Sequence, residues 1–350
     1  MYKFCFLLLL LFLSLPGKSQ RVPLSAIVEK LKQGKSVSAS DFGFQEYSII
    51  DEGDTILFYT YSKPGTNPAS IYLELPGTNA EDVYTYHKEK NGNYWFNSLT
   101  SFDFSFLPDD FLFVIVAKPG FGFVSNGDSL VVPSKYWEKT SLQDRVQRVD
   151  RALKFVSKKL IKKPKQVVVF GYSEGFYVGA KLAAVNKQIT HLGIGGGGGF
   201  IDFYDFILFN QRSLCEEKAN PDSVIKSNES LISSLSEMVQ NPSSTEFNGG
   251  YTYKRWASFA EPPLNSLVKL NIPIYQVHGS LDESTAIENA YLVPLEFARL
   301  GKKNLNFKVY PNSDHSLIER HGEGKETNHW NEMMKEFFQW VQIKVQFLLD

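Results

Sequence analysis

Two kinds of hydrophobic pattern alternate along the second half of the chain. Continuous apolar runs occur at residues 111–117 (FLFVIVA) and 166–170 (QVVVF), and such runs are typical of parallel strands that are buried on both faces. Between them, residues 141–160 carry apolar side chains at alternating steps of four and three, which predicts an amphipathic helix. The pattern therefore predicts a strand, a helix and a second strand in succession.

The same alternation continues to the end of the chain. Further strands are predicted at residues 191–194, 272–277 and 305–310. Further helices are predicted at residues 175–185, 290–300 and 328–349. Strands that alternate with helices form a mostly parallel sheet with helices on both faces. The fold class is therefore predicted to be α/β.

The preceding region has a different pattern. Residues 46–62 (EYSIIDEGDTILFYTYS) contain two alternating segments joined by a polar turn with a glycine, which predicts a β-hairpin. Residues 69–75 predict a third strand, which ends at Pro76-Gly77-Thr78. Residues 79–108 are polar and aromatic, and we predict no particular element there.

The alternation is interrupted between residues 200 and 271. This segment has helical apolar patches at 203–209 and 231–238, followed by an aromatic cluster that contains Trp256 and Phe259. The sheet pattern resumes at residue 272. We therefore predict one domain, residues 46–350, with a cap (residues 200–271) inserted after the sixth strand and placed over one end of the sheet.

The N-terminus has the form of a secretory signal peptide. Lys3 is followed by an apolar run at residues 4–15, then by Pro16, Gly17 and the small residue Ser19. We predict a signal peptide at residues 1–19, cleaved before Gln20. A membrane anchor is the alternative, but the run is shorter than the roughly 20 residues that span a bilayer. The protein is therefore expected to be exported from a bacterial cell, to the periplasm or beyond it, without a stable membrane anchor.

Residues 20–45 are predicted to form a short helix, at residues 23–34, and a linker. After the signal peptide is removed, Cys215 is the single cysteine that remains. One cysteine cannot form an internal disulfide, so the fold must be stable without one.

The charge balance narrows the range of partners. The 350 residues contain 37 Lys and Arg against 38 Asp and Glu, and the net charge is −1. A nucleic-acid-binding protein normally has a basic excess, so no nucleic-acid partner is expected. The lysines at 158–165 are interpreted as a solvated face at the end of a helix. No oligomeric state is predicted.

No cofactor or metal is expected either. The glycine run at residues 195–199 does not fit the dinucleotide-binding motif, and no acidic residue follows it at the required spacing. We interpret the run as a strand exit that needs a close approach of other groups to the backbone. No cluster of His, Cys or Asp has metal-ligand spacing.

One motif with catalytic chemistry lies directly after a predicted strand. Residues 171–175 read GYSEG, and a predicted helix begins immediately afterwards. A G-x-S-x-G sequence between a buried strand and a helix is typical of a sharp turn that exposes a nucleophilic serine, here Ser173. The N-terminus of the helix favours developing negative charge.

A serine nucleophile needs a base, and the base needs an acid that orients it. Asp282 follows the predicted strand at 272–277, and His315 follows the one at 305–310. Open α/β sheets bind their ligands at these carboxyl ends of strands. The alternatives are Glu283 and Glu288 for the acid and His321 and His329 for the base. Ser173 could instead be an ordinary turn serine, and Asp282 a helix N-cap for a segment that begins at Ser284. His278 is interpreted as structural.

From about residue 46 onward, the sequence resembles the α/β-hydrolase superfamily, whose triad also follows the order Ser, Asp, His. The resemblance implies Ser173 as nucleophile, Asp282 as acid and His315 as base. It also implies an oxyanion hole formed by the amides of Glu174 and Thr78. The sequence departs from the family pattern at Pro76-Gly77-Thr78, where His-Gly is common, and at Phe176, where a small residue is common.

These features predict an exported serine hydrolase that cleaves an acyl bond, most favourably a carboxylic ester, through a covalent acyl-enzyme. The partner would be a small-molecule acyl substrate, and Tyr172, Trp256 and Phe259 would line its pocket. A small serine peptidase or a thioesterase of the same fold is the near alternative. A binding protein that keeps the fold without catalysis is the alternative of another class.

Overall fold

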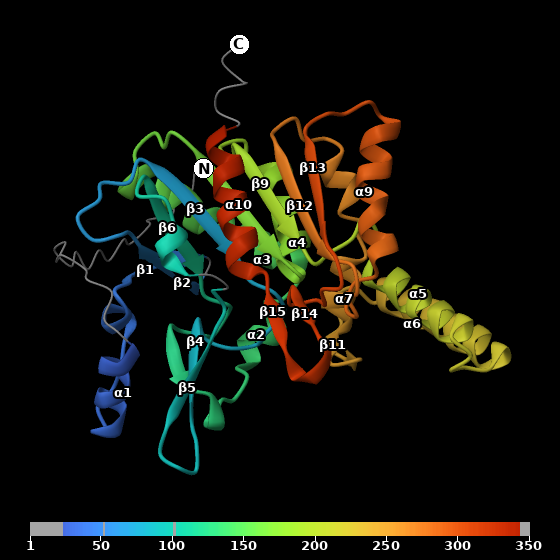
Figure 1. The fold of residues 1–350 in the computed structure, drawn as a ribbon, viewed down its shortest axis with the longest axis horizontal. Coiled ribbons are helices and arrows are strands. Elements are labelled where there is room, and N and C mark those ends of the chain that lie inside the picture. Colours follow the sequence, from blue (N-terminus) through green and yellow to red (C-terminus); the bar gives the residue numbers. More distant parts are fainter. Residues whose placement is uncertain (1–23, 52, 101–102, 344–350) are drawn as a thin grey trace, which may run out of the picture.

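A computed structural model describes residues 24–51, 53–100 and 103–343 (Figure 1). The predicted signal peptide at residues 1–19 lies outside the described residues. The predicted C-terminal helix reaches beyond them, and its described part is α10 (Trp330–Ile343). The short helix predicted near the N-terminus corresponds to α1 (Leu24–Lys32). No described helix combines the length and the apolar character that a membrane crossing requires.

The central element is an eight-stranded sheet with the order β1-β2-β6-β3-β8-β9-β12-β13. The first two strands form the predicted antiparallel hairpin, and β2 also pairs antiparallel with β6. From β6 to β13 every neighbouring pair is parallel. The strands are β1 (Gln45–Asp51), β2 (Asp54–Tyr61), β3 (Ser70–Leu75), β6 (Phe111–Val116), β8 (Val167–Tyr172), β9 (His191–Gly195), β12 (Ile274–Gly279) and β13 (Leu305–Tyr310). The predicted α/β class with a mostly parallel sheet is confirmed.

Helices cover both faces of this sheet because its strands are apolar on both faces. One hydrophobic core lies between the sheet and the helices α3 (Leu142–Phe155), α4 (Glu174–Val185) and α9 (Ile287–Arg299). The second core lies on the other face, under α10 and α1. Neighbouring positions of β3 show the alternation, since Leu73 belongs to the first core and Tyr72 to the second.

The predicted helix at residues 141–160 begins and ends close to the expected positions. Ser141 caps α3, because its hydroxyl accepts a hydrogen bond from the Asp144 backbone amide. The last turn, η4 (Val156–Leu160), is a π-helix.

Residues 79–108, for which no element was predicted, contribute to a second and smaller sheet. It has the order β5-β4-β7, with β4 (Tyr84–Lys88) antiparallel to β5 (Tyr94–Ser98) and parallel to β7 (Val124–Asn126). Figure 1 shows it beside the carboxyl ends of the main parallel strands. A two-stranded antiparallel sheet, β14 (Ile318–Arg320) and β15 (Glu326–Asn328), also lies at this end.

The segment between β9 and β12 is an insertion into the main sheet, and β9 is the sixth of the main strands in chain order. It contains a small core of its own, which includes Phe203, Met238 and Trp256. Figure 1 shows α5 and α6 as a helical pair that projects from the end of the sheet. The elements are α5 (Asp202–Cys215), α6 (Pro221–Gln240), β10 (Phe247–Asn248), β11 (Tyr251–Thr252), α7 (Tyr253–Phe259) and α8 (Leu264–Leu267).

The remaining short elements connect these layers. They are η1 (Ala39–Phe42), η2 (Phe104–Phe106), η3 (Gly127–Ser129), α2 (Ser134–Glu138) and η5 (Gly322–Gly324).

Candidate active site

Ser173 lies at the sharp turn between β8 and α4. Its backbone has φ 56° and ψ −122°, a conformation that L-residues other than glycine rarely adopt and that is found at functional sites. Two hydrogen bonds hold the turn: the Ser173 amide donates to the Gly195 carbonyl at 2.9 Å, and its carbonyl accepts from the Phe176 amide at 2.9 Å. The sequence motif therefore forms the strained strand-to-helix turn that it predicts.

The flanking glycines are required because α4 starts very close to the sheet. A side chain at Gly171 would overlap the Gly175 carbonyl, and one at Gly175 would overlap the Leu75 carbonyl. The glycine run at residues 195–199 has a similar explanation. Added side chains there would collide with the rings of Tyr172 and Phe176 and with Asn289. The run therefore makes room for the fully buried Phe176, the residue that departs from the family pattern.

Asp282 and His315 are brought together by the loops that follow β12 and β13. His315 Nδ1 lies 2.8 Å from Asp282 Oδ2. The other oxygen, Asp282 Oδ1, accepts from the Ser284 and Thr285 amides at 2.8 and 2.7 Å. Asp282 therefore orders its own loop and binds the imidazole as well. The helix-cap alternative for Asp282 is wrong, because α9 begins at Ile287 with Ala286 as its N-cap residue. Burial raises the pKa of Asp282, but the contacts with His315, His278 and Thr285 outweigh it and leave that pKa below its ordinary value.

The environment of His315 favours its protonated form. Burial lowers the pKa of His315, but the hydrogen bond and the charge of Asp282, together with Glu283 and Asp314, outweigh it and raise the pKa above its ordinary value. The backbone is fixed too, since Tyr172 Oη donates to the His315 carbonyl at 2.8 Å. A carboxylate only accepts hydrogen bonds, so the proton lies on Nδ1 in the neutral imidazole and Nε2 is the acceptor.

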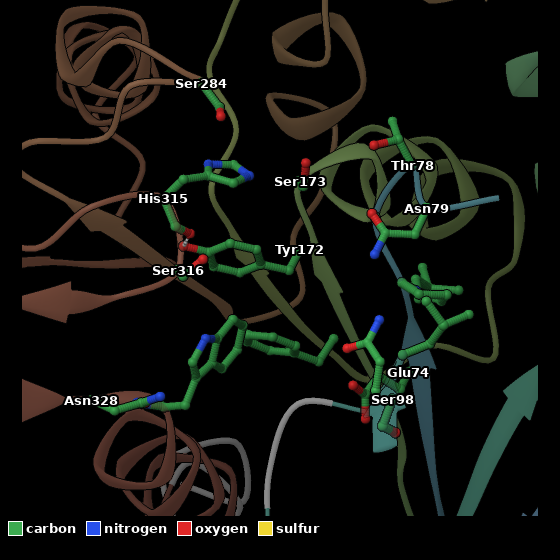
Figure 2. A pocket seen from close by; sticks show the side chains of 17 residues that line it. Glu74, Thr78, Asn79, Ser98, Tyr172, Ser173, Ser284, His315, Ser316 and Asn328 are labelled. Carbon is green, nitrogen blue, oxygen red and sulfur yellow. Dashed lines mark hydrogen bonds between the residues drawn. The ribbon is translucent and has the colours of Figure 1, made fainter. Parts of the chain in front are cut away.

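Ser173 and His315 line the same pocket, and the imidazole points toward the serine hydroxyl (Figure 2). Among the hydrogen bonds of the described residues, none joins these two side chains. Catalytic hydrogen bonds are often long in ligand-free structures and shorten when the substrate binds.

None of the alternative acids and bases takes the place of Asp282 or His315. Glu288 pairs with Arg212, and Glu283 is exposed and accepts from the His315 backbone amide at 3.3 Å. His329 contacts Glu319 and Glu332, and His321 contacts Thr327. His278 is buried at the end of β12, where its Nε2 lies 3.0 Å from the Thr285 carbonyl.

The loop that contains Thr78 lies directly beside the serine. A side chain at Gly77 would lie 3.3 Å from Ser173 Cβ. Two side chains bind three successive carbonyls of this loop. Buried Lys118 donates to the Gly77 and Asn79 carbonyls, and Tyr136 Oη donates to the Thr78 carbonyl at 2.9 Å. In a trans peptide the N–H points opposite to the C=O, so the Thr78 amide points away from Lys118.

Two backbone amides near Ser173 are left without an acceptor among the described residues. One is the Thr78 amide, and the other is the Glu174 amide in the first turn of α4, where helix amides have no intrahelical partner. Together they can donate two hydrogen bonds to one negatively charged oxygen.

Solved structures with the same chain path include two esterase-type enzymes. A thermostable carboxyl esterase from Bacillus coagulans is 15 % identical and matches with a TM-score of 0.51, over 88 % of this chain and 99 % of that one. A lipase in its open form is 13 % identical and matches with a TM-score of 0.52, over 84 % of this chain and 96 % of that one.

The chain has the α/β-hydrolase fold. Neither a protein-family model nor a curated protein sequence matches it.

Within this α/β-hydrolase fold, the side chain of Glu174 joins the cap to the body. It is completely buried and pairs with Arg145 from α3 and with Arg255 from α7, whose Nη2 lies 2.8 Å from Glu174 Oε2. Burial raises the pKa of Glu174, but the two arginines and Lys118 outweigh it, so the pKa lies below its ordinary value. Glu174, whose amide the family resemblance assigns to an oxyanion hole, is therefore held from both sides.

Two pockets meet at the serine of this hydrolase fold. The larger has a volume of about 660 Å³ and is lined by Tyr172 and His315, among others. The smaller, of about 170 Å³, lies on the cap side and is lined by Trp256 and Phe259. All three pocket residues expected from the sequence thus line a pocket at Ser173, but Tyr172 lies on the opposite side from the other two. No group of three or more His, Cys, Asp or Glu in the described chain is placed to hold a metal ion.

The sequence did not indicate Lys118, Tyr136, Arg145 or Arg255. The one local signal is the position of Lys118, a charged residue directly after the buried run at 111–117. The others lie on helices, where arginine and tyrosine are common on exposed faces.

Proposed function

We propose that the protein is an exported serine hydrolase that cleaves a carboxylic ester through a covalent acyl-enzyme. The observation that carries this proposal is the strained turn at Ser173, in one pocket with an imidazole that is held by a buried carboxylate. The likeness to a carboxyl esterase and a lipase supports an acyl bond as the target. Export rests on the sequence of residues 1–19.

In the proposed reaction, His315 Nε2 takes the proton of Ser173 as Oγ attacks the carbonyl carbon. Asp282 keeps the other ring proton on Nδ1 and stabilises the imidazolium that forms. The imidazolium then protonates the oxygen of the leaving alcohol, and the bond between that oxygen and the carbonyl carbon breaks. Water attacks the acyl-enzyme in the second half, again with His315 as base.

The Thr78 and Glu174 amides would stabilise the oxyanion of each tetrahedral intermediate. A single donor of this type is typically worth about 3–4 kcal/mol of transition-state stabilisation. Because Lys118, Tyr136 and the two arginines hold both segments from behind, the amides would need little reorganisation during the reaction.

The proposal is tested by labelling the mature protein with a fluorophosphonate, which reacts with activated serines. We expect the wild type to be labelled and Ser173→Ala and His315→Ala to lose labelling, while circular dichroism shows that all three remain folded. A folded wild type without labelling would contradict the proposal and would favour the binding protein. Hydrolysis of peptides or thioesters in preference to oxygen esters would favour the near alternatives.

A further inference from the structure

The two pockets at Ser173 share the reacting serine but differ in their other groups. Ser173, Thr78 and Ser284 line both pockets. His315 lines the larger pocket and is absent from the described residues that line the smaller one. The site is therefore asymmetric about the serine.

This asymmetry assigns the two halves of an ester. The imidazolium must donate its proton to the oxygen of the leaving alcohol, so that alcohol has to lie on the side of His315. The larger pocket is then the alcohol site, and the smaller pocket receives the acyl group.

The acyl site is small and its walls are firmly held. Its volume of about 170 Å³ lies below the ~300–1,000 Å³ of pockets for drug-sized ligands. Trp256 and Phe259 are each more than nine-tenths buried. Both belong to α7, which is fixed to the body by the ion pair of Arg255 with Glu174. A short acyl group fits within such a site, and a long chain would have to extend out of it.

The alcohol site is large and mostly polar. Its volume is about 660 Å³, and amide and hydroxyl side chains from both small sheets and the loops line it (Figure 2). Such groups can both donate hydrogen bonds to hydroxyls and accept them. The residues are Asn79, Asn97, Ser98, Ser316 and Asn328.

Several of these groups are already oriented. Asn79 Nδ2 and Asn97 Nδ2 donate to the Glu81 carboxylate at 2.7 and 3.0 Å, which leaves their carbonyl oxygens to accept from a ligand. Trp330, whose ring centroid lies 4.6 Å from that of Tyr172, supplies an apolar surface in the same pocket. Fixed acceptors beside an aromatic surface suit a cyclic alcohol with several hydroxyls, because the C–H faces of its ring can pack on the aromatic side chain.

We propose that the substrate is an ester of a short acyl group, from acetyl to butyryl, with a bulky polyhydroxylated alcohol such as a sugar. This inference rests on the proposed function. Ser173 Oγ forms a bond to the acyl carbon while the bond to the sugar oxygen breaks, and that oxygen takes the proton from His315. Water then releases the short carboxylic acid and regenerates the serine.

Two substrate series on the wild type test the two halves separately. For the acyl half, p-nitrophenyl acetate, butyrate and octanoate are compared, and we expect kcat/KM for the acetate to exceed that for the octanoate at least 100-fold. For the alcohol half, release of acetate from 6-O-acetylglucose, which keeps its other hydroxyls free, is compared with release from ethyl acetate, and we expect at least a tenfold preference for the sugar ester.

One variant in each pocket tests which side chain causes each preference. Phe259→Ala enlarges the acyl site. It should reduce the ratio of kcat/KM for p-nitrophenyl acetate to kcat/KM for the octanoate at least tenfold. Trp330→Ala should lower kcat/KM for 6-O-acetylglucose at least tenfold, and more than for ethyl acetate. Trp95→Ala is the matched control, because Trp95 is exposed on β5 and stacks on His87 outside both pockets.

The outcomes separate this inference from the proposed function. A wild type that is labelled by fluorophosphonate but prefers octanoate, or hydrolyses ethyl acetate as well as the sugar ester, overturns the substrate class alone. A folded wild type that is not labelled overturns both. The wild-type series decides the matter even if Phe259→Ala fails to fold.

Discussion

Ser173 is held in its strained conformation by bonds to two different elements. A residue with this backbone geometry costs about 1–3 kcal/mol and persists only where its surroundings determine it. Here the Gly195 carbonyl at the end of β9 and the Phe176 amide in α4 hold the peptide groups of Ser173. The hydroxyl itself takes no part in these bonds, so it remains available for reaction.

The protonation of His315 sets the pH dependence that we expect. Only the neutral imidazole can accept the serine proton, so kcat/KM should rise with pH. Because Asp282, Glu283 and Asp314 raise the pKa of His315, the midpoint of this rise should lie above the ordinary value of about 6.5.

Glu283→Gln should move this midpoint to lower pH by about 0.2–0.7 of a pH unit, since an exposed charge makes a modest contribution. The measurement is a pH profile of kcat/KM at low salt, and 1 M salt should reduce the difference. Glu296→Gln is the control, because Glu296 pairs with Arg299 on α9 and should leave the midpoint in place. An upward shift for Glu283→Gln would contradict the electrostatic explanation.

Lys118 is expected to act on catalysis by positioning the Thr78 amide. Lys118→Met removes the donor to the Gly77 and Asn79 carbonyls and should lower kcat roughly 10–100-fold with a smaller change in KM, because the oxyanion is a transition-state feature. Tyr136→Phe removes one neutral hydrogen bond to the same loop and should have a smaller effect on kcat.

Urea unfolding of both Lys118 and Tyr136 variants separates positioning from stability. If Lys118→Met is destabilised but keeps its kcat, the lysine has a purely structural role.

At the scale of elements, the path of α4 across the sheet depends on where its glycines lie. Gly175→Ala should destabilise the protein by about 1–3 kcal/mol or more, because the new Cβ overlaps the Leu75 carbonyl of β3. It should also lower fluorophosphonate labelling by displacing the start of the helix.

Gly179 in the same helix provides the matched control. An added Cβ there would make ordinary contacts of 3.4–3.7 Å with Leu75, Leu192 and Ile194, so Gly179→Ala should stabilise the helix by up to about 1 kcal/mol. Urea unfolding and labelling of the two variants test both expectations. Equal stability of the two variants would show that α4 does not approach β3 as closely as described.

The elements that the sequence predicted are those with a long and regular hydrophobic pattern. Apart from the edge strand β13, the parallel strands are buried on both faces, and α3 is buried on one face, so their apolar residues follow a simple pattern. The strands β4 and β5 escaped prediction because they are short and only Tyr84 and Thr85 among their residues are buried, and the partner that completes their sheet, β7, lies beyond β6 in the chain. Pairing between segments this distant leaves no local signal.

At the scale of the whole molecule, a buried ion pair and a buried hydrogen-bonded carboxyl group connect the cap to the body. Arg255 in the cap pairs with Glu174, and Asp205 on α5 accepts from the Ala286 amide and Asn289 Nδ2 at 2.9 Å each. Burial raises the pKa of Asp205 to about 8, despite these two donors. The cap is therefore fixed beside both the nucleophile turn and the loop of Asp282.

The candidate site was predictable from the sequence only in part, because contacts between segments that are distant in the chain leave no local signal. Ser173, Asp282 and His315 each follow a strand that the pattern reveals, and parallel strands bring their carboxyl ends to one edge of the sheet. Lys118, Arg145 and Arg255 act through partners that are distant in the chain. Their roles become visible only when α3, the cap and the loop at Thr78 are placed in space.

The insertion between β9 and β12 also has a consequence for how the chain folds. These strands are neighbours in the sheet, with Leu192 beside Ile274, yet the whole cap separates them in sequence. Joining them closes a long loop, and each doubling of loop length costs roughly 0.6 kcal/mol in closure entropy. Helices α5 and α6 pack through contacts that are local in the chain and can form early. A cap that forms before β9 meets β12 shortens the loop that has to be closed, so the folding of the cap should make the pairing of these two strands less costly in entropy.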